Sequence, residues 1–180
     1  AQGARVVVGY NRGEERARAL LNALPGYGHD VQRIVLEDSG SIASASAAIA
    51  ARYDRLDILV NSAGFTRPIP HTDLESLDDS LFDSIMTANV RGVFATIRAL
   101  APLMRRTGNA VIVNVSSIAA FNGAGSNIAY GASKAALDTM SISLARILGP
   151  EIRVLCVSPG AVATDFVAGR GRDALEKAAE

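Results

Sequence analysis

The sequence is poor in several residue types, and each shortage excludes a class of protein. Its 180 residues include one cysteine and no tryptophan, and aromatic residues make up 5% of the chain. A single cysteine, Cys156, cannot form an internal disulfide, which excludes a disulfide-stabilised fold and favours a reducing, cytoplasmic location. Because Cys156 stands within a short apolar segment, we expect its side chain to lie in the core.

The chain also lacks a net charge and long hydrophobic runs. The chain has 18 basic and 18 acidic residues, so its formal net charge is zero. Without a basic stripe, and with few aromatic side chains, the sequence predicts no nucleic-acid partner. No apolar run approaches the roughly 18 residues of a membrane span, so we expect no membrane partner. The two histidines, His29 and His71, lack metal-ligand spacing, and we expect no metal site.

Short apolar segments alternate with helical segments along the chain. Strands are predicted at residues 5–10, 31–36, 57–61, 111–115 and 152–157, and helices at 14–24, 41–53, 78–105 and 128–148. This alternation predicts an α/β fold with a doubly wound parallel sheet, similar to the Rossmann fold, covered by helices on both faces. Because no linker or repeat divides the sequence, we predict a single domain over residues 1–180.

Lysine is the rare cation in this chain. Sixteen of the 18 basic residues are arginine, which leaves Lys134 and Lys177. Lys134 follows Tyr130 by four residues in a predicted helix, so the two side chains share a face. An ammonium is a compact charge that can lower the pKa of a nearby phenol. We interpret the pair as an acid/base tyrosine with its electrostatic partner; the alternative is an ordinary surface pair.

Small and polar residues follow three of the predicted strands. Ser117 comes just after strand 111–115, Ser62-Ala63-Gly64 follows strand 57–61, and Ser158-Pro159-Gly160 follows strand 152–157. Ligands of open α/β sheets bind outside the carboxyl ends of the strands. The sequence therefore predicts a site at this edge, where the side chains of Ser117, Tyr130 and Lys134 are expected to converge.

Together these motifs resemble the short-chain dehydrogenase/reductase family, over roughly residues 3–164. The resemblance is carried by Asn61-Ser62-Ala63-Gly64, by Asn89 in Ala88-Asn89-Val90-Arg91-Gly92, by Ser117 with Tyr130-Gly-Ala-Ser-Lys134, and by Ser158-Pro159-Gly160-Ala161-Val162-Ala163-Thr164. Ser62 and Ser158 each stand where the family pattern has Asn.

The resemblance implies a catalytic set of Asn89, Ser117, Tyr130 and Lys134. Tyr130 would be the general acid/base, Ser117 would hold the substrate oxygen, and Asn89 would hold a water that links Lys134 to solvent. Judged alone, Ser117 is also typical of a turn hydroxyl, and Asn89 of a polar residue bonded to backbone. The substrate pocket is expected to include Ser117, Phe121 and Phe166, with Phe65 nearby.

The resemblance also implies a nicotinamide cofactor. Strand 5–10 ends without the carboxylate that usually holds the ribose of NAD, and Arg12 could instead bind a 2′-phosphate. We therefore expect NADP(H), with NAD(H) as the alternative. Asp38 is interpreted either as a contact to the adenine amine or as a helix N-cap. The expected cofactor-binding residues are Tyr10, Arg12, Asp38, Asn61, Ala63, Gly64, Tyr130, Lys134, Pro159, Gly160, Val162 and Thr164.

Two parts of the family pattern are not found in the sequence. Family members begin with a strand and a Gly-rich turn that holds the cofactor pyrophosphate, and they end with a substrate-covering segment and a last strand. We therefore expect a sheet that is incomplete at both ends. Because the first strand of the family lies between the strands predicted here at 5–10 and 57–61, we expect these two not to pair directly, and we expect the 180 residues alone not to form a stable sheet.

The predicted function is an oxidoreductase that transfers a hydride between NADP(H) and a ketone or secondary alcohol. The alternative is a catalytically inactive fragment, or a non-enzymatic relative that acts as a binding or assembly module. The helices at 78–105 and 128–148 carry apolar residues on more than one face, which favours a second partner. In the family these two helices pair across a two-fold axis, so we predict a homodimer or homotetramer through them.

Overall fold

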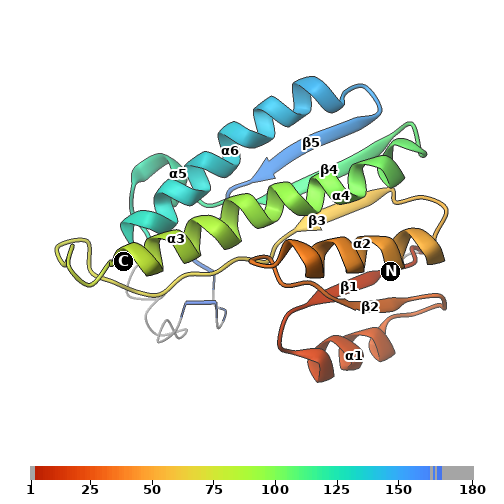
Figure 1. Cartoon of the computed structure of the whole chain (residues 1–180), viewed down its shortest axis with the longest axis horizontal. Coiled ribbons are helices and arrows are strands. Elements are labelled where there is room, and N and C mark those ends of the chain that lie inside the picture. Colours follow the sequence, from red (N-terminus) through yellow and green to blue (C-terminus); the bar gives the residue numbers. More distant parts are fainter. Residues whose placement is uncertain (1–2, 163, 165, 168–180) are drawn as a thin grey trace.

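The computed structural model describes residues 3–162, 164, 166 and 167. Within them, parallel strands form a two-stranded sheet, β1-β2, and a three-stranded sheet, β3-β4-β5 (Figure 1). This arrangement of parallel strands and intervening helices confirms the predicted α/β class. The strands are β1 (Val7–Tyr10), β2 (Asp30–Arg33), β3 (Ile58–Asn61), β4 (Ala110–Val115) and β5 (Ile152–Val157).

The helices follow the predicted pattern with one addition and one interruption. They are α1 (Glu14–Ala23), α2 (Ser39–Arg52), α3 (Asp79–Met86), the π-helix η1 (Thr87–Gly92), α4 (Val93–Arg105), α5 (Ala119–Asn122) and α6 (Ile128–Leu148). The helix predicted at 78–105 is one helical run in Figure 1, but its middle is a π-helix. The addition, α5, is a single turn, too short to give a periodic signal.

Strand β2 is shorter than the segment predicted at 31–36. It ends at Arg33, opposite Tyr10, the last residue of β1. The amide of Ile34 still donates to the Tyr10 carbonyl at 2.7 Å, but β1 provides no partner beyond that point. An extended segment is a strand only while a neighbour pairs with it, and the apolar pattern alone cannot show where the neighbour stops.

Strands β1 and β3 belong to different sheets. In the described part of the chain β1 pairs with β2, and β3 pairs with β4 from Ile58↔Val111 to Asn61↔Asn114. No ladder joins β1 to β3 there. The expectation that these two strands would not pair directly is confirmed.

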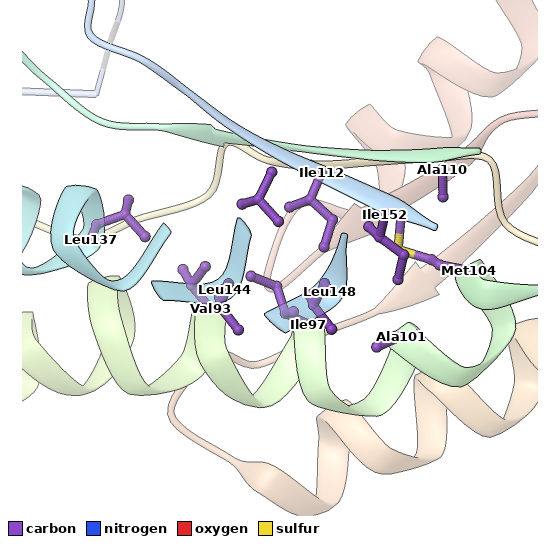
Figure 2. Close-up of a cluster of buried hydrophobic side chains, with 11 residues drawn as sticks. Val93, Ile97, Ala101, Met104, Ala110, Ile112, Leu137, Leu144, Leu148 and Ile152 are labelled. Atoms are coloured by element: carbon purple, nitrogen blue, oxygen red, sulfur yellow. The ribbon is translucent and has the colours of Figure 1, made fainter. Parts of the chain in front are cut away.

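The main core lies between β4–β5 and the helices α4 and α6 (Figures 1 and 2). Along α6, apolar side chains recur at helical spacing on the face toward the sheet, and burial of each contributes about 1.5–3 kcal/mol. This packing fixes the direction of α6 and carries its first turn to the carboxyl end of β4. The cluster comprises Val93, Ile97, Ala101, Met104, Ala110, Ile112, Leu137, Leu144, Leu148, Ile152 and Val154.

The expectation that Cys156 lies in the core is wrong, because the residue is exposed. Burial in β5 alternates through Ile152 and Val154 and then stops, and these two residues are the only members of the core cluster from this strand. Cys156 therefore lies just beyond the last core layer. The opposite face of the sheet exposes Ile58, Val60, Leu155 and Val157.

Candidate active site

The first turn of α6 is positioned by a buried asparagine. Asn127 is the N-cap of this helix, and its Oδ1 accepts from the Tyr130 amide at 2.7 Å. Its Nδ2 donates to the Arg67 carbonyl at 2.7 Å and to Thr66 Oγ1 at 3.2 Å. The loop after β3 is thereby bound to the start of α6. The cap fixes the turn that presents Tyr130, whose side chain is half-buried.

Lys134 lies one turn further along α6 and is 5% exposed. Its Nζ donates to the carbonyl of Val115, the last residue of β4, at 2.7 Å, and lies 5.7 Å from the centre of the Tyr130 ring. Burial lowers the pKa of Lys134 to about 8, although the negative charge of Asp138 opposes this shift. The ammonium is thus held at the carboxyl edge of the sheet beside the phenol.

Asn89 joins the same site from the π-helix η1. Its Oδ1 accepts from the Phe65 amide at 2.7 Å, and its Nδ2 donates to the Phe65 carbonyl and to Ser133 Oγ, both at 3.0 Å. Ser133 Oγ in turn donates to the Tyr130 carbonyl at 2.8 Å. Asn89 therefore bonds to backbone groups, as expected of a polar residue within a helix. It also connects the loop after β3 to the turn of α6 that carries Tyr130.

Gly64 lies between Asn89 and Lys134. A Cβ atom at Gly64 would come within 3.0 Å of Asn89 Oδ1 and 3.9 Å of Lys134 Nζ. The loop after β3 therefore passes directly beside the lysine, and a side chain there would press on Asn89. π-Helical turns often occur at functional sites, and this one brings Asn89 to the lysine.

Ser117 lies between β4 and α5, two residues before the first residue of this helix. Its Oγ accepts from the Ala119 amide at 3.2 Å, so the hydroxyl serves a local turn. The next residue, Ile118, donates its amide to the Pro159 carbonyl at 3.1 Å, which joins the loops after β4 and β5. A Cβ atom at Gly125 would lie 3.2 Å from Ala119 Cβ and 3.3 Å from Tyr130 Cδ1. The turn after Ser117 is thus brought close to Tyr130.

The aromatic residues expected at the pocket have different surroundings. The rings of Phe166 and Tyr130 lie 6.1 Å apart, centre to centre, at an interplanar angle of 52°. Phe121 is 76% exposed, and Phe65 is exposed where its backbone meets Asn89. The structure therefore brings Phe166 to the tyrosine, while Phe121 lies on the surface.

Two residues expected to contact the cofactor have structural partners. Asn61 Nδ2 donates to Asn114 Oδ1 at 2.8 Å, which links β3 to β4. Asp38 is the N-cap of α2, and its Oδ1 accepts from the Gly40 amide at 2.8 Å. The single side-chain oxygen of Asn61 and the second carboxylate oxygen of the exposed Asp38 can still accept a ligand contact. The loop after β5 exposes Gly160, Val162 and Thr164.

Arg33 lies beside the turn expected to bind the cofactor, although the sequence did not point to it. Its Nε donates to the carbonyl of Asn11 at 3.2 Å, and it stands opposite Tyr10 in the β1–β2 register. A second guanidinium therefore lies beside the turn that holds the exposed Arg12. Only the pairing of β2 with β1 brings Arg33 there, so no local signal could have found it. Asn127, in contrast, could have been found as the residue before a predicted helix.

The residues present fit a nicotinamide cofactor. An ammonium has three protons to donate, and the described structure gives Lys134 one acceptor, the Val115 carbonyl. Its remaining protons are available to hydroxyl groups such as those of a ribose. The glycine at position 64 keeps the space beside this ammonium clear of a side chain.

The model of the short-chain dehydrogenase family matches residues 1–174. The chain belongs to this family. A relative from Streptomyces violaceoruber, which bears the name ketoacyl reductase 2 of the granaticin polyketide synthase, is 39% identical over 92% of the chain. The 2-(R)-hydroxypropyl-CoM dehydrogenase of Xanthobacter autotrophicus is 34% identical over 87% of it.

Solved structures agree with this family and its fold. The gluconate 5-dehydrogenase of Burkholderia cenocepacia, in complex with NADP and tartrate, is 25% identical and superimposes with a TM-score of 0.79 over 91% of this chain and 64% of its own. The present chain spans 66% of the length of the Streptomyces relative and 63% of the length of the Xanthobacter enzyme. Among the residues that the structure describes, no helix is long and apolar enough to cross a membrane.

Proposed function

We propose that this short-chain dehydrogenase transfers a hydride between NADP(H) and a ketone or secondary alcohol, with Tyr130 as the general acid/base. The observation that carries the proposal is the buried Lys134 ammonium, 5.7 Å from the Tyr130 ring centre and held to the end of β4. A cation beside a phenol stabilises the negative charge that develops on its oxygen as the proton leaves, which a tyrosine acting as general acid/base requires.

Each candidate site residue then has its own role in the proton transfer. Tyr130 donates its proton to the substrate oxygen in reduction and accepts it in oxidation, while Ser117 orients that oxygen. Lys134 stabilises the phenolate and returns a proton to it. Asn89, which bonds the amide and the carbonyl of Phe65, would hold a water that links Lys134 to solvent. The nicotinamide, when bound, supplies or accepts the hydride.

The arginine pair at the end of β1 supports the choice of NADP(H). Arg12 is exposed in the turn after β1, and Arg33 is anchored to the carbonyl of Asn11 in that same turn. Two guanidinium groups suit a 2′-phosphate, because each provides charge-assisted, bidentate hydrogen bonds. NAD(H) lacks that phosphate, so the two guanidinium groups do not strengthen its binding.

Fluorescence titration with NADPH and NADH tests this proposal. We expect NADPH to bind more tightly, and Arg12→Ala or Arg33→Ala to weaken NADPH binding by about tenfold or more while NADH binding stays unchanged. Arg55→Ala is the matched control, since Arg55 is exposed and pairs with Asp57 away from this turn. Equal affinity for the two cofactors, unaltered in both arginine variants, would refute the NADP preference.

The substrate class is supported by the related enzymes. A ketoacyl reductase acts on a ketone, and a 2-hydroxypropyl dehydrogenase acts on a secondary alcohol, as their names state. The ring of Phe166 beside Tyr130 gives the site a partly apolar wall. Oxidoreductase activity with a simple ketone separates this function from the alternative of a non-enzymatic binding module.

Assembly through α4 and α6 is part of the proposal. Phe94 on α4 and Ile142 and Ile147 on α6 are large apolar side chains exposed to solvent. Such exposed residues favour a partner, and we propose a homodimer or homotetramer. A cytoplasmic location stays a prediction from the single cysteine.

A further inference from the structure

A buried carboxylate on α6 has no hydrogen-bond partner. Both oxygens of Asp138 are inaccessible to solvent, and within the described residues neither accepts a hydrogen bond. Burial of an unpaired carboxylate is strongly unfavourable, so a charge of opposite sign or a proton must compensate it. Asp138 stands one helical turn after Lys134 and two turns after Tyr130, on the same face of α6.

The neutral donors around Asp138 are already engaged or weak. Ser141, three residues further along α6, donates its proton to the Leu137 carbonyl at 2.7 Å and accepts from Asn114 Nδ2 at 2.8 Å. The thiol of Cys156 on β5 faces Asp138, and its partial burial together with the contact and charge of this carboxylate raises its pKa, although the contact is too poor in geometry to satisfy either oxygen. A thiol is also a weak donor.

Lys134 carries the positive charge that Asp138 influences most directly on this helix. The titratable groups that face its ammonium are Tyr130 and Asp138 from α6 and Cys156 from β5; β4 offers the Val115 carbonyl and η1 the neutral amide of Asn89. Of these, Asp138 is the largest influence that opposes the effect of burial on the lysine. The ammonium donates to Val115 and makes no hydrogen bond to Asp138 among the described residues, so it acts on the carboxylate through its charge.

We propose that Asp138 is a positioning residue of this active site: its carboxylate is the counter-ion that keeps the Lys134 ammonium charged beside Tyr130. The pairing explains why a carboxylate is buried here without a neutral donor. Its catalytic consequence rests on the proposed function, because a charged Lys134 matters only if Tyr130 is the acid/base.

Competitive acetylation of the intact protein, followed by peptide mass spectrometry, tests the pairing without any need for activity. Only the neutral amine reacts, so the pH dependence of labelling from about pH 6 to about pH 11 reports the titration of Lys134. The chain's other lysine, Lys177, is the internal standard. In Asp138→Asn we expect the midpoint for Lys134 to fall by about one pH unit, with about tenfold faster labelling below the midpoint.

Two variants control for structure and for general charge. Asp138→Glu keeps the carboxylate and should hold the midpoint near the wild-type value, and Asp83→Asn removes an exposed carboxylate on α3 and should not move it. If the Asn variant fails to fold, Asp138→Ser, smaller and uncharged, should give the same downward shift. An unchanged Lys134 midpoint in the uncharged variants, or an equal shift in Asp138→Glu, overturns the pairing.

The pH profile of kcat/KM tests the positioning role itself. In Asp138→Asn the alkaline limb should move to lower pH by the same amount as the labelling midpoint, while Asp138→Glu restores it. A labelling shift without a shift of the alkaline limb overturns the positioning role. Failure of the proposed function would give a different result: activity would survive in Tyr130→Phe, which lacks the hydroxyl, while the labelling results would stay as expected.

Discussion

The ammonium of Lys134 lies 5.7 Å from the centre of the Tyr130 ring and donates to the Val115 carbonyl at 2.7 Å. One side chain thus connects the first turns of α6 with the last residue of β4. A charge placed between a helix and a strand end in this way stays beside the phenol while substrate enters and leaves. Its burial also lowers its pKa to about 8.

Replacement of Tyr130 by Phe keeps the ring and removes the proton. We expect turnover to fall by about 10²–10⁴-fold, the usual range for loss of a general acid/base, while the dissociation constant of the cofactor stays nearly unchanged. Steady-state kinetics and fluorescence titration measure the two quantities. Tyr27→Phe, at a site 90% exposed, is the control and should match the wild type. Retained turnover in the Tyr130 variant would eliminate this residue as the acid.

Lys134 should make stability depend on pH in a defined window. Its pKa is lowered from 10.5 to about 8 in the folded protein, so folding disfavours the charged form. Below about pH 8 this penalty, about 3 kcal/mol, is fully present. Between about pH 8 and 10.5 the unfolded chain binds the proton that the folded chain has lost, so stability rises with pH.

Comparison with Lys134→Met isolates this contribution, because other groups titrate in both proteins. We expect the free energy of unfolding of the wild type, relative to the Met variant, to be constant below about pH 8 and to increase by about 3 kcal/mol as the pH approaches 10.5. Denaturant titration at a series of pH values measures the difference. A flat difference across this window would show that Lys134 titrates normally.

The sequence predicted the framework of this fold because its signals are local. α6 has the predicted bounds, 128–148, since its apolar spacing is regular and Gly149-Pro150 ends it. The candidate pair Tyr130 and Lys134 could be named because a Tyr and a scarce Lys stand four apart, whereas Asn89 and Ser117 were named only through the family resemblance. The π-helix could not be predicted, since its extra residue per turn is fixed by the contact between Asn89 and the distant Phe65.

Other features depended on contacts between distant segments. Arg33 lies beside the turn after β1 only because β2 pairs with β1. A role for Asp138 can be inferred only once the donors around it, such as Ser141, are known to be engaged elsewhere. Cys156 was misplaced for a related reason: a strand pattern shows which side chains share a face, but not where the covering helix ceases to protect them.

Asn89 should contribute to the stability of the fold as well as to the candidate site. Its side chain makes three hydrogen bonds, two of them to the backbone of Phe65, in a buried position. Asn89→Ala leaves those backbone groups without partners, and we expect a loss of about 2–4 kcal/mol in the free energy of unfolding. Asn22→Ala, at an exposed position of α1, should change it by less than about 0.5 kcal/mol. Equal effects in both variants would contradict this role.

Gly92 permits close contact between η1 and the segment after β2. A Cβ atom there would lie 2.4 Å from the Leu36 carbonyl oxygen and 2.7 Å from Leu36 Cβ. Gly92→Ala should therefore destabilise the protein by about 2–4 kcal/mol, although Ala favours a helix by about 1 kcal/mol. At Gly131 in α6 the nearest atom, the Ala119 carbonyl oxygen, is 3.4 Å away, so Gly131→Ala should be neutral or slightly stabilising. Thermal unfolding that ranks the two variants in the opposite order would refute the close contact.

The exposed apolar side chains of α4 and α6 should mark the subunit interface. Phe94 and Ile142 are exposed, whereas a separate set of apolar residues on these helices, such as Ile97 and Leu144, packs against β4 and β5. We expect the protein to be a dimer or tetramer by light scattering at micromolar concentration. Ile142→Glu should shift it to smaller species, because a two-fold axis would bring two buried carboxylates toward one another. Leu20→Glu, an equally apolar and exposed position on α1, should leave the mass unchanged. A wild-type protein that is monomeric under these conditions would exclude the interface.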